Sequence, residues 1–365
     1  MDPRLFALGV AWLLGWYLCS RVRLVPYAPD PDPGVPSPSV VIPARDEELT
    51  LPTILAGLAS QTTPPREVIV VDDRSTDTTA AVAAARGARV VRGEPVPAGW
   101  VGKAWALQQG VTAAEGDVVV CLDADVDPSS HLIARLEQCH AQRGGLVSVQ
   151  PYHEMRHWWE RAAAFFNLVA VMGVGLGSPG PSPARERAAF GPCLIARRDA
   201  LLTHLAHRSV RRAVIEDVAL GRRFAAAHEP VTSYGGGDLL AFRMYDRPGR
   251  LVEGFAKNFA AGAGSTPVPR LVAIVVWVTA CLVAGWGVFA GGAIALGIYG
   301  AFAVQCFVML RQLGSFGIVT ALLYPVNAVI FVAVFLWSLV LLGRGQVRWK
   351  GRTLSTRRGS KRGGP

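Results

Sequence analysis

Several common functional signatures are absent from this chain of 365 residues. Neither a GxGxxG turn nor a GxxxxGK[ST] loop occurs, so dinucleotide and P-loop phosphate chemistry have no support in the sequence. The six cysteines include no CxxC pair, which argues against a zinc site and a disulfide framework. Reduced thiols, as in the cytoplasm, fit this pattern.

Formal charge is absent from two long stretches, Leu271–Leu310 and Leu313–Gly343. About 20 apolar helical residues cross a bilayer core. The first stretch therefore predicts two membrane spans. The second predicts one span and a shorter segment, which we expect to be re-entrant and broken at Pro325. A buried core helix of a soluble protein does not fit such lengths.

Both ends of the chain carry basic residues next to apolar stretches. Leu5–Leu18 is apolar and is followed by Arg21 and Arg23. A cleaved signal peptide carries its basic residues before the apolar run, so we expect an uncleaved anchor whose downstream side is cytoplasmic. The tail from Arg344 holds eight Lys or Arg and no acid, out of a net charge of +10. It directly follows a membrane span, which favours attraction to anionic lipid over nucleic-acid binding. A cytoplasmic tail requires two or four full C-terminal crossings, or one re-entrant element.

The middle of the chain alternates between two kinds of segment. Short β-type runs are expected at 39–43, 67–73, 88–92 and 118–123, and helices at 47–60, 76–85 and 103–114. This alternation predicts an α/β fold with a mostly parallel sheet. In such sheets, ligands bind at the carboxyl ends of the strands. Two alternatives stay open for 156–175, which is rich in Trp and Phe: a helix in the membrane interface or a buried core helix.

The run 118–122 ends in three carboxylates at alternate positions, Asp123, Asp125 and Asp127. If extended geometry continued, their side chains would converge on one face. Oxygen ligands suit Mg²⁺ or Mn²⁺, which one or two carboxylates hold together with substrate phosphates. The alternative is an acidic turn.

Two further acidic pairs follow apolar segments. Asp72 and Asp73 end the second expected strand, where they would accept hydrogen bonds from a base and a ribose, or simply form a turn. Glu216 and Asp217 begin an expected helix, where the helix dipole alone would also favour acids. Three acidic sites in this order favour a functional interpretation.

This order of motifs resembles glycosyltransferase family 2, with its GT-A fold, over about residues 39–260. The matching motifs are Ile42–Glu48, Val70–Asp77, Asp123–Asp125 and Glu216–Asp217. Two further stretches, Gly99–Ala106 and Arg243–Asn258, resemble the membrane-bound members that glycosylate carotenoids and hopanoid-like lipids.

The resemblance implies roles for particular residues. Asp217 would be the general base, with Glu216 as its neighbour. Asp125 and Asp123 would hold Mg²⁺ or Mn²⁺. On the acceptor or diphosphate side it places Arg243, Tyr245 and Lys257. The nucleotide sugar would be bound by Pro43, Ala44, Glu47, Asp72, Asp73, Lys103 and Asp123. Asp127 matches no motif, and before Pro128 we expect it in a turn or at a helix cap.

We accordingly divide the chain into six parts: a transmembrane anchor (1–22), a linker (23–38), a GT-A catalytic domain (39–240), an interfacial acceptor-side segment (241–270), a transmembrane region (271–343) and a basic cytoplasmic tail (344–365).

The expected function is inverting, metal-dependent transfer of a sugar, glucose by expectation, from a UDP-sugar to a membrane lipid such as a carotenoid. The enzyme would be a multi-pass protein of the cytoplasmic membrane whose catalytic domain faces the cytoplasm, with no nucleic-acid partner. One alternative is a synthase of polysaccharide or of carrier-lipid-linked sugar. The Gln-x-x-Arg-Trp motif of related processive synthases is absent where Arg243 and Tyr245 stand. A second alternative is a catalytically silent sensor of nucleotide sugars. Ester and ether glycosides, and every oligomeric state, stay open at this point.

Overall fold

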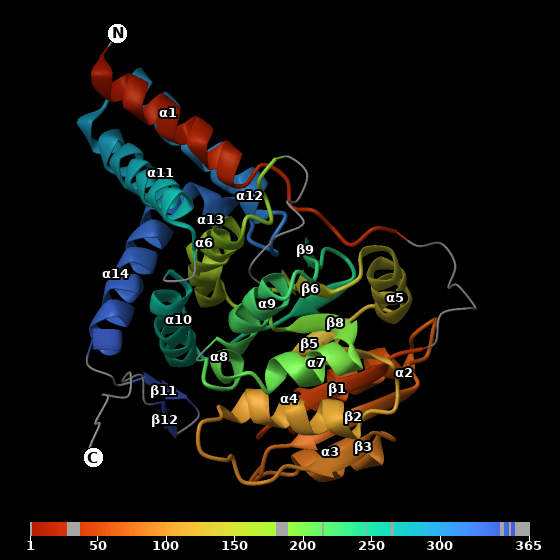
Figure 1. Ribbon diagram of the computed structural model, residues 1–365. Coiled ribbons are helices and arrows are strands. Elements are labelled where there is room, and N and C mark those ends of the chain that lie inside the picture. Colours follow the sequence, from red (N-terminus) through yellow and green to blue (C-terminus); the bar gives the residue numbers. More distant parts are fainter. Residues whose placement is uncertain are drawn as a thin grey trace, which may run out of the picture.

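The protein is described from a computed structural model that covers residues 2–27, 37–179, 189–213, 215–245, 247–263, 266–343, 347–349 and 352–354. Side chains are described as far as 341, apart from those of 257–261 and 263. An α/β domain carries an arm of apolar helices at one end (Figure 1). The basic tail lies largely outside the described residues, which include from it a small antiparallel pair, β11 (Val347–Trp349) and β12 (Arg352–Leu354).

The α/β domain is built on a seven-stranded sheet with the order β3-β2-β1-β4-β8-β6-β9. Only β8 runs antiparallel to its neighbours, which confirms the predicted mostly parallel sheet. The strands are β1 (Ser39–Ala44), β2 (Glu67–Asp72), β3 (Arg89–Arg92), β4 (Val118–Leu122), β6 (Leu146–Gln150), β8 (Cys193–Arg197) and β9 (Val231–Gly235).

Helices cover both faces of this sheet because its strands are apolar on both sides. On β1, Val40 and Ile42 enter the core under α2 (Leu51–Ala59) and α5 (Leu132–Arg143). Val41, between them, enters the opposite core. That core is covered by α4 (Gly102–Ala113), α7 (Arg198–Leu205) and α9 (Glu216–Ala226). Two shorter helices, α3 (Thr79–Ala85) and α8 (Arg208–Arg211), complete the domain.

A small second sheet lies at the carboxyl ends of the main strands. It consists of β5 (Val126–Pro128), β10 (Leu240–Phe242) and β7 (Tyr152–His153). After it come η1 (Trp158–Ala163) and α6 (Ala164–Val174), and later α10 (Pro248–Ala263). Of the two alternatives for 156–175, the core helix is correct for α6, since Phe165 and Phe166 are fully buried. Trp158 in η1 is 82% exposed.

Among the described residues, three helices are long and apolar enough to cross a membrane: Val268–Ala290, Ala293–Leu310 and Tyr324–Leu341. They correspond to α11 (Val268–Gly287) with η2 (Val288–Ala290), α12 (Ala293–Leu310) and α14 (Tyr324–Gly343). The short α13 (Ile318–Leu322) precedes α14, as expected for one span and a shorter segment. The helices separate at Leu323, just before Pro325. Proline is tolerated in the first turn of a helix, where its missing N–H costs nothing.

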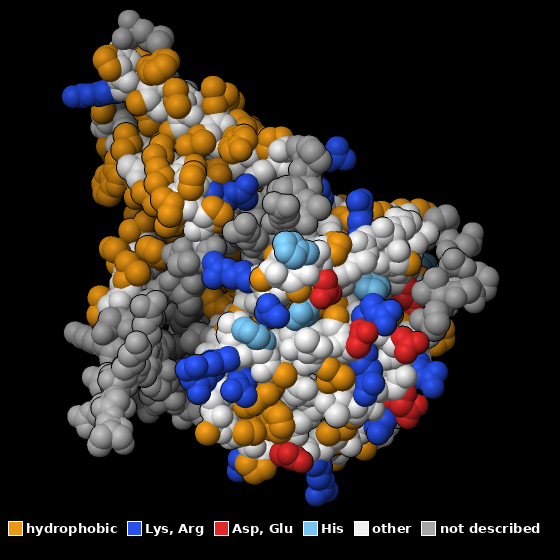
Figure 2. Space-filling view, viewed as in Figure 1, with side chains coloured by type: hydrophobic (Ala, Val, Ile, Leu, Met, Phe, Trp, Pro, Cys, Tyr) orange, Lys and Arg blue, Asp and Glu red, His pale blue; other side chains and the backbone are white. Residues whose placement is uncertain are grey.

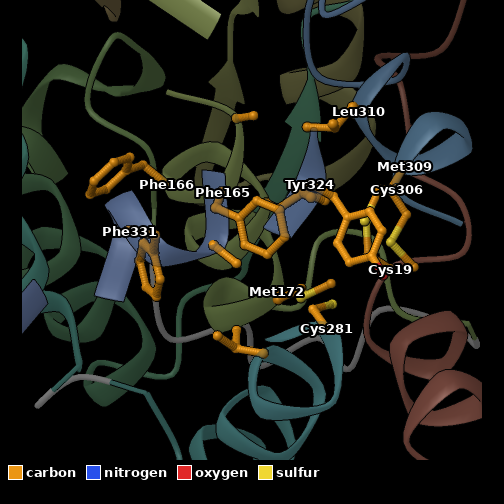
Figure 3. Close-up of a cluster of buried hydrophobic side chains, with 14 of the residues drawn as sticks. Cys19, Phe165, Phe166, Met172, Cys281, Cys306, Met309, Leu310, Tyr324 and Phe331 are labelled. Atoms are coloured by element: carbon orange, nitrogen blue, oxygen red, sulfur yellow. The ribbon is translucent and has the colours of Figure 1, made fainter. Parts of the chain in front are cut away.

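The N-terminal helix α1 (Pro3–Leu18) has 16 residues and packs beside α11. At about 1.5 Å per residue it is about 24 Å long, less than the roughly 30 Å of a bilayer core. Its buried end joins a shared core of aromatic and sulfur-containing side chains from α6, α11, α12 and α14 (Figure 3). All six cysteines are free.

Candidate active site

The turns after β1 and β2 are locked together by side chain to backbone hydrogen bonds. Asp46, whose φ is 53°, accepts a hydrogen bond from the Thr76 amide at 2.7 Å. The Thr79 hydroxyl accepts the Glu47 amide at 2.8 Å. The expected helix from 47 therefore begins only at Leu51, because Glu47 belongs to this turn.

Asp72 and Asp73 lie at the end of β2 beside this turn. The Asp73 amide donates to the Ala44 carbonyl at 2.8 Å, and the Asp72 carboxylate accepts the Ser75 amide at 3.0 Å. Asp73 also faces Arg45 across 3.8 Å. The structure thus brings together residues 43–47 and the Asp72–Asp73 pair, as the motif order predicts.

Lys103 lies at the centre of the acidic residues. It is the second residue of α4, and its ammonium lies 2.7 Å from an Asp123 oxygen and 3.1 Å from a Glu216 oxygen. Burial lowers the pKa of Lys103, but the charges of Asp123, Glu216 and Asp217 outweigh burial and raise that pKa well above its ordinary value. One cation therefore joins the end of β4 to the start of α9, residues that are about 90 positions apart in the chain.

The pKa of the Asp125 carboxyl is raised to about 7, from an ordinary 3.8. Burial is the largest cause, followed by the charges of Asp123 and Glu47, while Lys103 opposes them. Three carboxylates thus act on one another at short range. They repel unless a cation or a proton intervenes.

Asp127 does not join them. The main strand ends at Leu122, residues 123–125 turn, and Asp127 stands exposed on β5, where it pairs with Ala241 of β10. The expectation of a turn or helix cap at Asp127 is wrong, because the chain re-enters extended geometry there. Convergence of all three carboxylates on one face is also wrong, since the turn breaks the alternation of side chains.

Asp217 begins α9 and is held by backbone amides. Its carboxylate accepts the Gly191 amide at 2.6 Å and the Val218 amide at 2.8 Å. Burial and then the Glu216 charge raise the pKa of Asp217 to about 6, against the opposing effect of Lys103. Gly191 was not singled out from the sequence. Its signal is the Gly191–Pro192 pair just before β8, where a Cβ at Gly191 would lie 2.7 Å from the Asp217 carboxylate.

The three residues expected on the acceptor side, Arg243, Tyr245 and Lys257, have different surroundings in the structure. Arg243 follows β10 and donates to Glu160 at 2.9 Å and 2.6 Å. Glu160 was not singled out from the sequence either. Its signal is that it is an acid within a stretch rich in Trp and Phe. Tyr245 packs edge-on against Phe255 at 5.3 Å, and the charge of Asp125 contributes to raising the Tyr245 pKa. Lys257 belongs to α10, and its side chain lies outside what is described.

The chemistry of these groups fits a hard divalent cation. The donors are carboxylate oxygens, the preferred ligands of Mg²⁺ and Mn²⁺. Burial, and after it the charges of Asp123 and Glu47, raise the pKa of Asp125, and a bound cation would oppose this rise. No group of three or more His, Cys, Asp or Glu among the described residues is arranged to hold a metal by itself. A cation here would rely on two carboxylates and on phosphate oxygens of a substrate.

Comparison with known proteins gives concordant results. The family model for glycosyl transferase family 2 matches residues 39–172. The 4,4'-diaponeurosporenoate glycosyltransferase of Staphylococcus aureus strain MRSA252 is 34% identical over 87% of this chain and 88% of its own length. The protein of the same name from Staphylococcus haemolyticus is 31% identical over the same shares.

A solved structure shares the fold. The mannosyltransferase PcManGT of Pyrobaculum calidifontis, in complex with GDP-Man and Mn²⁺, superposes with a TM-score of 0.53. It covers 91% of this chain and 94% of its own, at 18% identity. Sheet, acidic site and neighbours together define a glycosyltransferase with a GT-A fold. The chain belongs to glycosyltransferase family 2, and it is similar to proteins named 4,4'-diaponeurosporenoate glycosyltransferase.

Proposed function

We propose that this enzyme transfers a sugar, expected to be glucose, from a UDP-sugar to a membrane lipid of the carotenoid type. The observation that carries the proposal is the half-buried acidic group around Lys103, which Tyr245 connects to α10 through its ring contact with Phe255. The relatives named for a carotenoid acid support the acceptor class. The cytoplasmic membrane, with the α/β domain on the cytoplasmic side, is the location where both substrates meet.

Nucleotide binding is assigned to the two turns that hydrogen bonds lock together. Pro43, Ala44 and Glu47 form one wall, and Asp72 and Asp73 form the other. Asp73 would accept from the base and Asp72 or Asp123 from the ribose. The preference for uridine rests on the family resemblance, and it is tested below against guanosine.

The diphosphate is assigned to Asp123, Asp125 and Lys103. Mg²⁺ or Mn²⁺ bound by Asp123 and Asp125 would stabilise the charge that develops on the leaving diphosphate. Lys103 would move its interaction from Asp123 to a phosphate oxygen, where its charge would add to the stabilisation of the leaving diphosphate. Arg243, which is paired with Glu160, then has a positioning role for η1.

The transfer step needs a single base. Asp217 would take the proton from the acceptor hydroxyl while the acceptor oxygen bonds to the anomeric carbon. The bond between that carbon and the diphosphate oxygen breaks, and its electron pair leaves with UDP. One displacement inverts the anomeric configuration, and general base assistance of this kind is worth roughly 10²–10⁴-fold. A carboxylic acid acceptor is already ionised near neutral pH and would depend less on Asp217.

The lipid acceptor would approach past Tyr245 and Phe255. Their rings pack together at 5.3 Å, and Phe255 stacks on Phe166 at 4.1 Å. This aromatic row leads from Asp125 toward α14, and Phe166 also touches Phe331 of that helix. Phe166, Phe255 and Phe331 are buried and Tyr245 is partly exposed, so a polyisoprenoid would meet this apolar cluster at Tyr245, beside the acidic site.

The test is transfer by the purified full-length enzyme in lipid bilayers containing a carotenoid acid or a carotenoid alcohol. UDP-glucose with Mn²⁺ should give one hexose per acceptor, detected by mass spectrometry of the extracted lipids. Chelation by EDTA should abolish the product, and GDP-mannose should not replace UDP-glucose. The Asp217→Asn variant should lose ether formation more severely than ester formation. A polymeric product, or no glycolipid from either acceptor, would contradict the proposal.

A further inference from the structure

One cavity lies away from the acidic site, at the junction of the sheet and the apolar arm. Its volume is about 730 Å³, within the usual range of roughly 300–1,000 Å³ for small-molecule sites. It lies beside the carboxyl ends of β6 and β9, whereas Asp123 follows β4. Three strand spacings, about 14 Å, separate β9 from β4 across the sheet.

Four arginines line this cavity, and no carboxylate is among the lining residues in the described part of the chain. The arginines are Arg21, Arg23, Arg143 and Arg311. Asp238, next to Gly237 of the lining, faces Arg135 across 3.7 Å, and Glu154 lies near Tyr152 of the lining. Two tyrosines and Gln312 complete the polar lining, and Arg143 hydrogen-bonds to one of the tyrosines, Tyr234.

The walls of the cavity are fixed by hydrogen bonds between distant parts of the chain. The segment after α1 adds to the sheet edge, because the Gly235 amide donates to the Arg23 carbonyl at 2.7 Å and Leu24 bridges to Gly235. Gln312, after α12, accepts the Val22 amide at 2.8 Å and donates to the Ser20 carbonyl at 3.3 Å. These hydrogen bonds hold the backbone that carries the arginines in a fixed position.

The position of the cavity at the ends of two apolar helices indicates what kind of ligand it binds. Arg21 follows α1 and Arg311 follows α12, so two apolar helices end at the same rim. Leu24, on the lining, is 48% exposed and offers an apolar edge beside the arginines. Basic side chains stand where the apolar arm joins the domain (Figure 2). A membrane phospholipid has this sequence of groups: an anionic phosphate next to glycerol and acyl chains.

We propose that the cavity binds the headgroup of an anionic membrane phospholipid, with Arg21, Arg23, Arg143 and Arg311 around its phosphate. Guanidinium groups bind phosphate oxygens in pairs, which gives such contacts both strength and orientation. Basic pockets beside membrane helices are suited to such headgroups. The lipid would join the arm to the far edge of the sheet and would not take part in sugar transfer.

The test uses the full-length protein in nanodiscs of phosphatidylcholine with one tenth phosphatidylglycerol. After release into mild detergent, native mass spectrometry should find one phosphatidylglycerol retained per protein. The double variant Arg21→Gln, Arg311→Gln should retain at least fivefold less. The matched control Arg86→Gln, Arg208→Gln removes the same charge from exposed positions outside the cavity and should behave as the parent.

A second variant, Arg143→Gln, lies on the domain side of the cavity and keeps the proposal testable if the double variant fails to fold. It should also lower retention, with an unchanged thermal unfolding midpoint in phosphatidylcholine alone. Equal retention by parent and Arg143→Gln would overturn the proposal, as would an equal loss in the control. Displacement by millimolar inorganic phosphate or glycerol phosphate would assign the cavity to a soluble phosphate and overturn the lipid source.

Discussion

Asp125 and Asp127 are two positions apart in the chain, yet their surroundings differ completely. Asp125 is half-buried and feels the charges of Asp123 and Glu47, whereas Asp127 is exposed on β5. We expect Asp125→Asn to lower Mn²⁺-dependent turnover on the order of 10²-fold, because an electrostatic stabiliser of the leaving group is weakened. Asp127→Asn should match the parent. Initial rates against Mn²⁺ concentration measure this, and identical Mn²⁺ dependence of both variants would refute the metal assignment.

The role of Asp217 predicts an acidic limb in the pH–rate profile. Its pKa is raised to about 6, so the carboxylate that accepts a proton is populated above that pH and lost below it. With a hydroxyl acceptor, kcat/KM should therefore fall as the pH drops through about 6. The apparent pKa of this limb is a property of the interacting acidic groups together, because their titrations are coupled.

Replacing Lys103 tests this assignment, because the direction in which the acidic limb should move is known. Its positive charge lowers the pKa of Asp217, so Lys103→Met should move the limb to higher pH. An Arg222→Met variant, which changes an arginine of the same helix as Asp217, is the comparison for a general charge effect. A limb that stays in place in Lys103→Met would mean that Asp217 is not the titrating base.

At the residue scale, the sequence predicts the acidic positions better than their partners. Asp72, Asp123 and Asp217 all follow or begin regular elements, which patterns of apolar residues locate. The pairing of Lys103 with Glu216 and of Arg243 with Glu160 joins residues far apart in the chain. Such contacts depend on the packing of several elements at once, and no local pattern encodes them.

At the scale of elements, helix α1 makes a close approach that one glycine permits. A Cβ at Gly15 would lie 2.3 Å from the Trp277 ring nitrogen and 2.8 Å from the Gln305 amide nitrogen. A Cβ at Gly9, on the same helix, would meet nothing within 4 Å. Gln305 is fully buried, accepts the Trp277 ring N–H at 2.9 Å and donates to the Trp12 carbonyl, so it joins α1, α11 and α12.

We therefore expect Gly15→Val to lower the free energy of unfolding by about 1–3 kcal/mol, the usual cost of overpacking. Gly9→Val should leave it close to that of the parent. Both changes alter helix propensity alike, so the difference reports packing of α1 alone. Unfolding in detergent, followed by tryptophan fluorescence, gives the comparison. Equal stability of the two variants would show that α1 is not docked as described.

Element positions were predicted well and element ends less well, for a physical reason. Apolar runs located β1, β2 and β4, because burial in the core dictates their residues. Apolar runs also located the three long C-terminal helices, which are long and apolar enough to cross a membrane although only 33–39% of each is buried inside the protein. The helices α2 and α3 begin later than expected because the Glu47 amide donates to Thr79 and the Glu48 amide donates to Asp77, which joins the two turns. Short polar residues serve both as helix caps and as loop ties, and the sequence does not distinguish these uses.

At the scale of the whole molecule, the catalytic domain and the membrane helices share one core. Phe165 of α6 stacks on Trp277 of α11 at 5.6 Å, and Phe166 lies 5.3 Å from Phe331 of α14. Leu251 and Phe255 of α10 are buried in the same cluster. The proposed boundary at 270 is therefore a boundary in the sequence only, because side chains from both sides of it pack in one core.

This shared core makes the domain dependent on its membrane helices. Removing residues 267–365 would expose Phe165, Phe166 and their neighbours, each worth about 1.5–3 kcal/mol of burial. We expect the 1–266 fragment to elute as aggregate in size-exclusion chromatography in mild detergent. A 1–343 chain, which lacks only the basic tail, should elute as one peak and bind UDP like the parent. If the 1–266 fragment also eluted as a single peak and bound UDP with parental affinity, the domain would fold alone, and the aromatic contacts between α6 and the arm would serve to position the acceptor without maintaining the fold.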